Sequence, residues 1–186
     1  MDPHHISFLV NPRAVWIVAA IVGAIAGYTD YRWRRIPNWL TVPGLLLGIA
    51  LNSLAQGGYG VRYSLVGAGL GLLILLPFVL IRSLGAGDWK LIGALGAFVG
   101  PHNLITVLFV TVVIAGLMAL FVVIWKRRFL QTMRNIGGML AAMMSLHLPG
   151  REVSLDNPES SKIPFGVAAA IAIVLFAAAQ LWNSRR

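Results

Sequence analysis

The sequence contains no cysteine and few acidic residues, and each shortage excludes a class of protein. Without cysteine the chain can form no disulfide, no thiolate zinc site and no iron–sulfur cluster. Its four histidines lack the spacing of metal ligands, so we expect neither a metal nor a cofactor. Charged residues make up only 11% of the chain. Soluble domains carry charge at about a quarter of their positions, so a soluble domain is excluded.

Hydrophobic residues, in contrast, make up 58% of the chain and occur in long runs. A helix needs about 20 apolar residues to cross a hydrocarbon core of about 30 Å. We therefore predict an all-α, polytopic membrane helix bundle, with residues 1–186 forming a single transmembrane domain. About six transmembrane helices are expected, over 14–30, 39–55, 64–82, 88–100, 104–125 and 164–183. The apolar run 137–148 is too short to span, and we interpret it as an interfacial or re-entrant helix, although a span over 129–149 stays open.

The net charge of +9 does not indicate a nucleic-acid partner, because the basic residues lie between the apolar runs. The connections 31–38, 82–90 and 126–163 hold three, two and six of the 15 lysines and arginines, and the opposite side holds four. Basic connections remain in the cytoplasm, so these three should face it. The lipid bilayer is thus the expected environment, most simply the cytoplasmic membrane.

Two of the six acidic residues lie at the ends of apolar runs. Asp30 ends the first run, and Asp88 begins the fourth. Each has a simple explanation, since Asp88 could be the N-cap of a helix and Asp30 could pair with Arg32 or Arg34. However, a carboxylate near hydrocarbon is costly and marks a functional site by default. Both acids fall on the predicted cytoplasmic side, so we expect a pair that shares a water molecule.

Such a pair can carry out acid–base catalysis. Two carboxylates that share one proton can activate a water molecule and protonate a carbonyl oxygen, as in aspartic proteases. Gly85 and Gly87 precede Asp88 and would permit a positive φ and the close approach of an extended substrate. Lys90 would contact the substrate or tune the acids, or else simply extend to the membrane interface.

Three motifs together resemble the type IV prepilin peptidases, a family of G-x-G-D intramembrane aspartic peptidases. They are TDYRWRRIPN (29–38), GAGDWKL (85–91) and IPFG (163–166). The resemblance implies an endopeptidase with Asp30 and Asp88 as its catalytic pair. It also implies a prepilin partner, whose helix is embedded in the membrane and whose leader is removed at the cytoplasmic face. Pilus assembly machinery would be a further partner.

The resemblance favours the short, Tad/Flp-type branch of the family. Longer members carry an insertion with paired cysteines that is associated with N-methylation, and this chain has neither feature, so methyltransferase activity is not expected. Two other functions stay open. One is a small transporter that uses the acids as proton or cation sites. The other is a non-catalytic assembly subunit.

Overall fold

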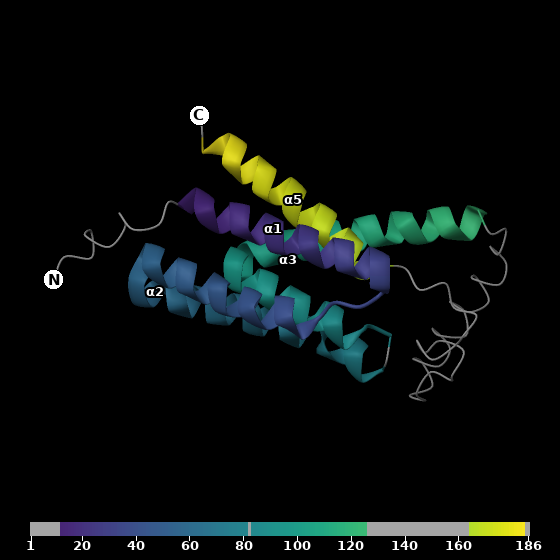
Figure 1. The fold of residues 1–186 in the computed structure, drawn as a ribbon, viewed down its shortest axis with the longest axis horizontal. Helices are drawn as coiled ribbons and strands as arrows, with labels where there is room; N and C mark the ends of the chain where they lie inside the picture. Colours follow the sequence, from purple (N-terminus) through teal and green to yellow (C-terminus); the bar gives the residue numbers. More distant parts are fainter. Residues whose placement is uncertain (1–11, 82, 126–163, 185–186) are drawn as a thin grey trace.

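The computed structural model describes residues 12–81, 83–125 and 164–184, and within these ranges the chain is helical with short connections and no strand. The predicted all-α class is therefore confirmed. All four helices are long and apolar enough to cross a membrane. They are α1 (Pro12–Trp33), α2 (Asn38–Leu80), α3 (Ala86–Trp125) and α5 (Phe165–Asn183) (Figure 1). The predicted helix at 137–148 lies outside the described residues.

Four helices stand where six spans were expected, because two of them are long and interrupted. At 1.5 Å per residue the 43 residues of α2 would extend about 65 Å, more than twice the hydrocarbon core. Instead, α2 is broken at Gly57 (φ 61°) and α3 at Gly100 (φ 73°). Only glycine adopts such φ values without strain. Both helices fold back at these breaks, which lie at the predicted boundaries between spans (Figure 1).

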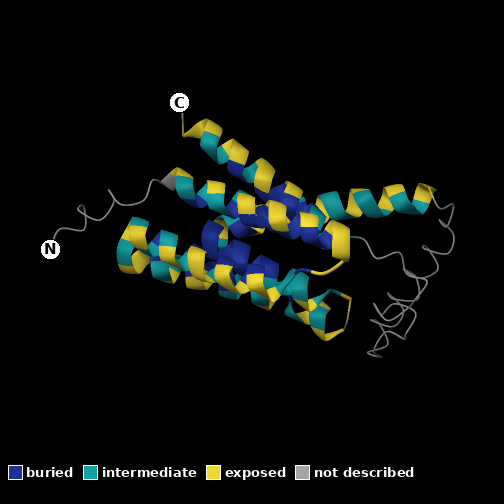
Figure 2. Ribbon diagram, viewed as in Figure 1, coloured by how far each residue is buried: buried dark blue, intermediate teal, exposed yellow. Residues whose placement is uncertain are grey.

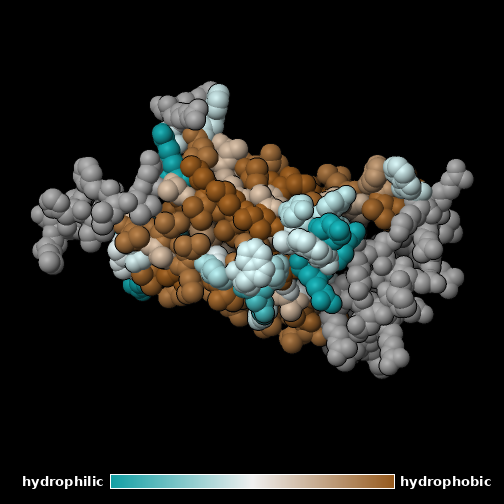
Figure 3. Space-filling view, in the orientation of Figure 1, coloured by the Kyte–Doolittle hydropathy of each residue, from teal (hydrophilic) through white to brown (hydrophobic). Residues whose placement is uncertain are grey.

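The first half of α3 is the centre of the bundle. Every residue from 91 to 100 is buried, and Figure 2 shows this segment as the main buried region inside the other helices. The outer surface is apolar in turn, with side chains such as Leu73 and Phe109 more than two-thirds exposed. Figure 3 shows hydrophobic side chains over most of the visible face, with hydrophilic ones gathered near the end of α1. Such a surface suits a lipid environment.

Glycines bring the helices into close contact. A Cβ atom at Gly27 would lie 2.5 Å from the Cβ of Ala170, and one at Gly67 would overlap the carbonyl oxygen of Gly96. Small residues at helix interfaces allow backbones to approach in membranes. As a result α1 packs against α5 and the second half of α2 packs against α3, which fixes where the ends of these helices meet.

Candidate active site

Asp30 lies in the last turn of α1 and is only 7% exposed. The helix ends at Trp33, and Arg34 follows in the left-handed conformation, with φ 54°, while its N–H donates to the Asp30 carbonyl oxygen at 2.8 Å. This is the geometry of a helix C-terminus that is normally taken by glycine. The guanidinium of Arg34 also interacts electrostatically with the Asp30 carboxylate.

Asp88 is the third residue of α3 and does not cap it. The Trp89 N–H donates to the Gly85 carbonyl oxygen at 3.1 Å, so Gly85 occupies the cap position. The Asp88 carboxylate accepts a hydrogen bond from the Gly85 N–H. This is the arrangement of an acidic third residue in a capping box. The interpretation of Asp88 as the N-cap residue is therefore wrong, because the helix begins two residues earlier than expected.

The two aspartates come together around one residue, Ile36. A Cβ atom at Gly87, next to Asp88, would lie 3.1 Å from the Ile36 carbonyl oxygen. On the other side, a Cβ atom at Gly166 would lie 2.8 Å from Ile36 Cδ1 and 2.9 Å from Asp30 Oδ2. The carboxylates of Asp30 and Asp88 interact electrostatically. The ends of α1 and the beginnings of α3 and α5 thus converge on one small region.

Each carboxylate keeps one oxygen that no protein group satisfies. Asp30 Oδ2 and Asp88 Oδ1 are buried, and in the described part of the chain neither has a hydrogen-bond partner. Buried polar atoms are nearly always paired, so two exceptions at one place require an explanation. The arrangement leaves acceptor positions for a water molecule or for a substrate carbonyl. No cluster of three or more His, Asp or Glu side chains that could hold a metal occurs among the described residues.

The two glycines of the motif act through close packing and not through backbone conformation. Neither Gly85 nor Gly87 has a positive φ, so that expectation is wrong. The turn is made without it. A Cβ atom at Gly85 would lie 2.9 Å from Asp88 Oδ2, and Gly87 contacts Ile36 as described above. The close approach expected at Gly87 is made by the protein's own chain.

Lys90 forms a specific contact across two helices. Its Nζ donates a hydrogen bond of 3.0 Å to Oδ1 of Asn38, the first residue of α2. The connection is exposed, and it ties the beginning of α3 to the beginning of α2 beside the aspartates.

Sequence reasoning missed the contribution of α5 to this site. The backbone N–H groups of Gly166 and Val167, in the first turn of α5, donate hydrogen bonds to the Asp30 carboxylate. A helix N-terminus favours a neighbouring anion through its unpaired amides and its dipole. The IPFG motif was the available signal. It places Pro164 just before α5 and Gly166 where α5 contacts Asp30 and Ile36.

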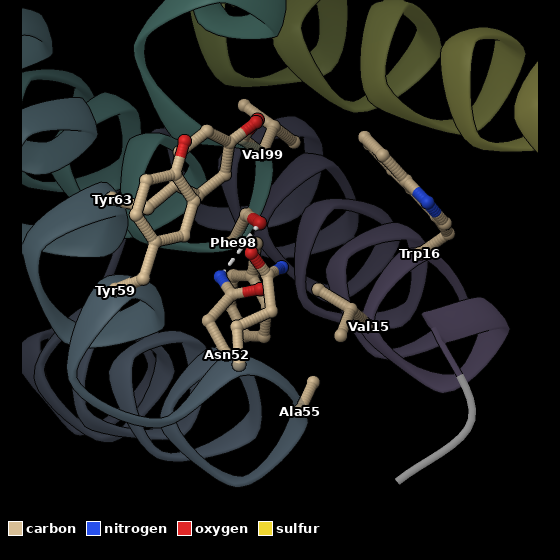
Figure 4. Close-up of a pocket in the computed structure, with 9 residues that line it drawn as sticks. Val15, Trp16, Asn52, Ala55, Tyr59, Tyr63, Phe98 and Val99 are labelled. Carbon is tan, nitrogen blue, oxygen red and sulfur yellow. Dashed lines mark hydrogen bonds between the residues drawn. The ribbon is translucent and has the colours of Figure 1, made fainter. Parts of the chain in front are cut away.

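A cavity of about 270 Å³ lies at the opposite end of the bundle, next to the two helix breaks (Figure 4). Asn52, which is 3% exposed, donates to the carbonyl oxygens of Ala97 and Phe98 at 2.9 and 3.0 Å. The Tyr63 hydroxyl donates to the carbonyl oxygen of Val99 at 2.8 Å. These contacts satisfy carbonyls that the break at Gly100 releases. The cavity is lined by Val15, Trp16, Asn52, Ala55, Gln56, Tyr59, Tyr63, Phe98 and Val99.

Comparison with known proteins agrees with the motifs. Residues 17–120 match the family model of the type IV leader peptidase family, and this range contains both aspartates. No curated protein and no solved structure matches the chain significantly. The matched region covers more than half of the chain and includes all of α2 and most of α1 and α3, three of the helices that can cross a membrane. The chain is therefore a multi-pass membrane protein that belongs to the type IV leader peptidase family, whose members are aspartic peptidases acting on prepilin-like substrates.

Proposed function

We propose that the chain is an intramembrane aspartic endopeptidase that removes the leader of a prepilin-like protein at the cytoplasmic face of the membrane. Asp30 and Asp88 are its catalytic pair in this proposal. The observation that carries it is the meeting of two carboxylates from different helices, each with a buried oxygen that no group in the described part of the chain satisfies. Burying two carboxylates side by side costs stability, which is typical of a reactive site.

The reaction would use one ionised and one protonated carboxyl group. The ionised carboxylate takes a proton from a water molecule as the water oxygen bonds to the scissile carbonyl carbon. The protonated partner gives its proton to the carbonyl oxygen. The tetrahedral intermediate then collapses and the C–N bond breaks. The leaving nitrogen takes the proton that came from the water, and a hydroxyl of the intermediate returns its proton to the partner carboxylate as the new C=O bond forms. Two neighbouring carboxyls readily hold this state, because like charges so close disfavour double ionisation.

The positions of the aspartates support a site at the membrane surface. Asp30 lies three residues before the end of α1, and Asp88 is the third residue of α3. Exposed Arg32 and Arg35 follow Asp30, and Lys90 follows Asp88. Basic residues at one end of a bundle indicate the cytoplasmic side. A substrate helix in the bilayer would unwind there, since helical backbone is closed to attack by water.

The same positions disfavour the transporter alternative. Transport sites for ions lie near the bilayer midplane on broken helices. In this chain the breaks are at Gly57 and Gly100, at the opposite end of the bundle, and the residues around them are amides and phenols. The six-span topology that we propose treats each interrupted helix as two antiparallel spans.

Co-expression with a tagged prepilin tests the proposal. Wild-type protein should convert the prepilin to its shorter form, seen by immunoblot, and Asp30→Asn and Asp88→Asn should each leave it uncleaved. Asp156→Asn, which removes a carboxyl in the polar segment 150–163, is the matched control and should cleave normally. Membrane fractions should contain all variants at equal amounts. Normal cleavage by either active-site variant would remove that residue from the pair, and normal cleavage by both would refute the mechanism.

The purified enzyme should also be independent of added metal. Cleavage in detergent should survive exhaustive treatment with EDTA, because the proton shared by the acids, and no metal, activates the water. Activity should fall at high pH, once both carboxyls are ionised and no proton is left for the carbonyl oxygen. Loss of activity with EDTA and recovery with zinc would contradict this mechanism.

A further inference from the structure

One buried hydroxyl near the aspartates also lacks a protein partner. Thr41, in the first turns of α2, is 2% exposed, and its Oγ1 has no hydrogen bond in the described part of the chain. The other two buried threonines bond within their own helices. Thr29 donates to the Ala26 carbonyl oxygen at 2.9 Å, and Thr111 donates to that of Val107 at 2.7 Å. Such internal bonding is the usual solution for a helical threonine.

Thr41 lies on α2 near the end of the bundle that holds the two aspartates. Gly44, three residues later on the same helix face, faces Val22 of α1 at 3.3 Å and Ala94 of α3 at 3.7 Å, measured from a Cβ atom built on it. At the end of the bundle, Ile36 lies against Gly87 of α3. Thr41 therefore falls between these two levels, facing the junction of α1 and α3. Along α2, Thr41 is three residues, or about 4.5 Å, further into the bundle than Asn38, whose side chain bonds Lys90 next to Asp88.

Three side-chain oxygens are buried without a hydrogen-bond partner in the described part of the chain. Asp30 Oδ2, Asp88 Oδ1 and Thr41 Oγ1 are the buried side-chain oxygen and nitrogen atoms without a hydrogen-bond partner among the described residues. They come from three different helices, and all belong to the same end of the bundle. The chance occurrence of three such atoms in one region is small, because buried polar groups in native proteins are almost always satisfied. A common partner explains all three.

We propose that the Thr41 hydroxyl is a third polar group of the active site, which holds a buried water molecule beneath the two carboxylates. Two consecutive O–H···O bonds of about 2.75 Å reach about 5.5 Å, which is enough to cover this offset along the axis of α2. The water would donate to Asp30 Oδ2 or Asp88 Oδ1 and accept from Thr41. Thr41 is then a positioning residue, which acts by fixing the orientation of the carboxylates. This role rests on the proposed peptidase function.

A positioning role predicts a particular kinetic pattern. Thr41 is buried below the acids and does not reach the substrate, so its loss should lower kcat and leave KM nearly unchanged. Misplacement of a catalytic group by about 1 Å can cost up to about 100-fold in rate. Thr41→Val keeps the shape of the side chain and removes the hydroxyl. We expect it to reduce kcat by about 10- to 100-fold, and Thr41→Ser, which keeps the hydroxyl, to recover most of the activity.

The experiment compares purified variants on a tagged prepilin in detergent, with kcat and KM measured over a range of pH. Thr111→Val is the matched control, because it also removes a buried hydroxyl but lies in the second half of α3, away from the aspartates. It should retain wild-type kinetics. Thr41→Val should in addition change the pH dependence of kcat, which a pure packing defect would leave alone. Thr41→Ala replaces it if the valine variant is poorly expressed.

Three outcomes would overturn the proposal. Thr41→Val with kcat within twofold of wild type, beside an inactive Asp88→Asn, removes Thr41 from the site and leaves the peptidase assignment intact. Equal loss in Thr41→Ser and Thr41→Val, with equal loss of thermal stability, assigns the effect to packing. Full cleavage by Asp88→Asn and Asp30→Asn refutes the peptidase mechanism itself, and the role of Thr41 fails with it.

Discussion

The two ends of the helix bundle contain buried polar groups in opposite states. Where α3 breaks, Asn52 and Tyr63 donate hydrogen bonds to the carbonyl oxygens of residues 97–99. Where α1 ends, Asp30 and Asp88 each keep a buried oxygen that has no hydrogen-bond partner among the described residues. The first arrangement is satisfied and supports the fold. The second lowers stability and keeps acceptor atoms available. Buried polar groups at one end therefore stabilise the fold, and those at the other end are available for a reaction.

The physical reason for the difference lies in the backbone. A break inside a membrane helix leaves carbonyl groups without their helical N–H partners. The bilayer core contains no water to bond them, so side chains must do so. The amides and phenol near Gly100 serve this purpose. No such demand exists at the aspartates, because Asp88 lies in the regular first turn of α3 and Asp30 in the last turn of α1. One Asp88 oxygen accepts the Gly85 N–H at the start of α3, but the unpartnered oxygen of each aspartate, among the described residues, is not required by the helix that carries it.

The largest effect is expected when one of the two aspartates is replaced, which should abolish activity without loss of stability. Asp88→Asn should reduce cleavage by at least about 10²- to 10⁴-fold, the usual contribution of a general acid or base. Its thermal unfolding temperature in detergent should stay the same or rise, because the variant removes a poorly satisfied buried carboxyl. Circular dichroism and a cleavage assay on one preparation measure both. A marked loss of stability would show that Asp88 is needed for the fold, as Asn52 is.

A smaller loss of activity should follow when the acid is displaced and not removed. In Gly166→Ala the new Cβ atom would lie 2.9 Å from Asp30 Oδ2 and 2.8 Å from Ile36 Cδ1, so the carboxylate must shift. We expect about a 10- to 100-fold decrease in kcat. Gly116→Ala is the matched control, since no atom lies within 4 Å of the position of its Cβ. Equal activity in the two variants would mean that Asp30 tolerates movement.

The reverse pattern is expected for Asn52. Asn52→Leu leaves the carbonyl oxygens of Ala97 and Phe98 without this donor and should destabilise the protein by about 1–3 kcal/mol. Its cleavage rate at a temperature where it is folded should remain within a few-fold of wild type. Gln56→Leu, an exposed amide on the same cavity, is the control for polarity. Loss of catalysis in folded Asn52→Leu would contradict the assignment of Asn52 to stability alone.

Tyr63→Phe should have the smallest effect. It removes the hydroxyl that donates to the Val99 carbonyl oxygen, but Asn103 Nδ2 also donates to that oxygen at 3.0 Å. With one donor remaining, the loss should be no more than about 1 kcal/mol, close to the average for hydrogen bonds between membrane helices. Equilibrium unfolding in detergent measures it. A loss above that of Asn52→Leu would show that the phenol has a further role near the cavity.

Much of the fold followed from local patterns in the sequence. The apolar runs predicted the helices, and the breaks at Gly57 and Gly100 fall at the expected span boundaries. Charge counting placed Asp30 and Asp88 on one side of the membrane, and the structure brings them to one end of the bundle. These features are readable because hydrophobic length and the distribution of lysine and arginine act residue by residue.

Only the tertiary structure decided what surrounds the two acids. The sequence by itself determined an all-helical membrane protein with two acids at helix ends and the motifs of its family. It did not determine that α5 amides bind Asp30, that Lys90 bonds Asn38, or that the Thr41 hydroxyl has no partner in the described ranges of the chain. These contacts depend on the register between helices that are distant in the chain. That register is set by the packing of glycines such as Gly27 and Gly67 against neighbouring helices, which local periodicity does not encode.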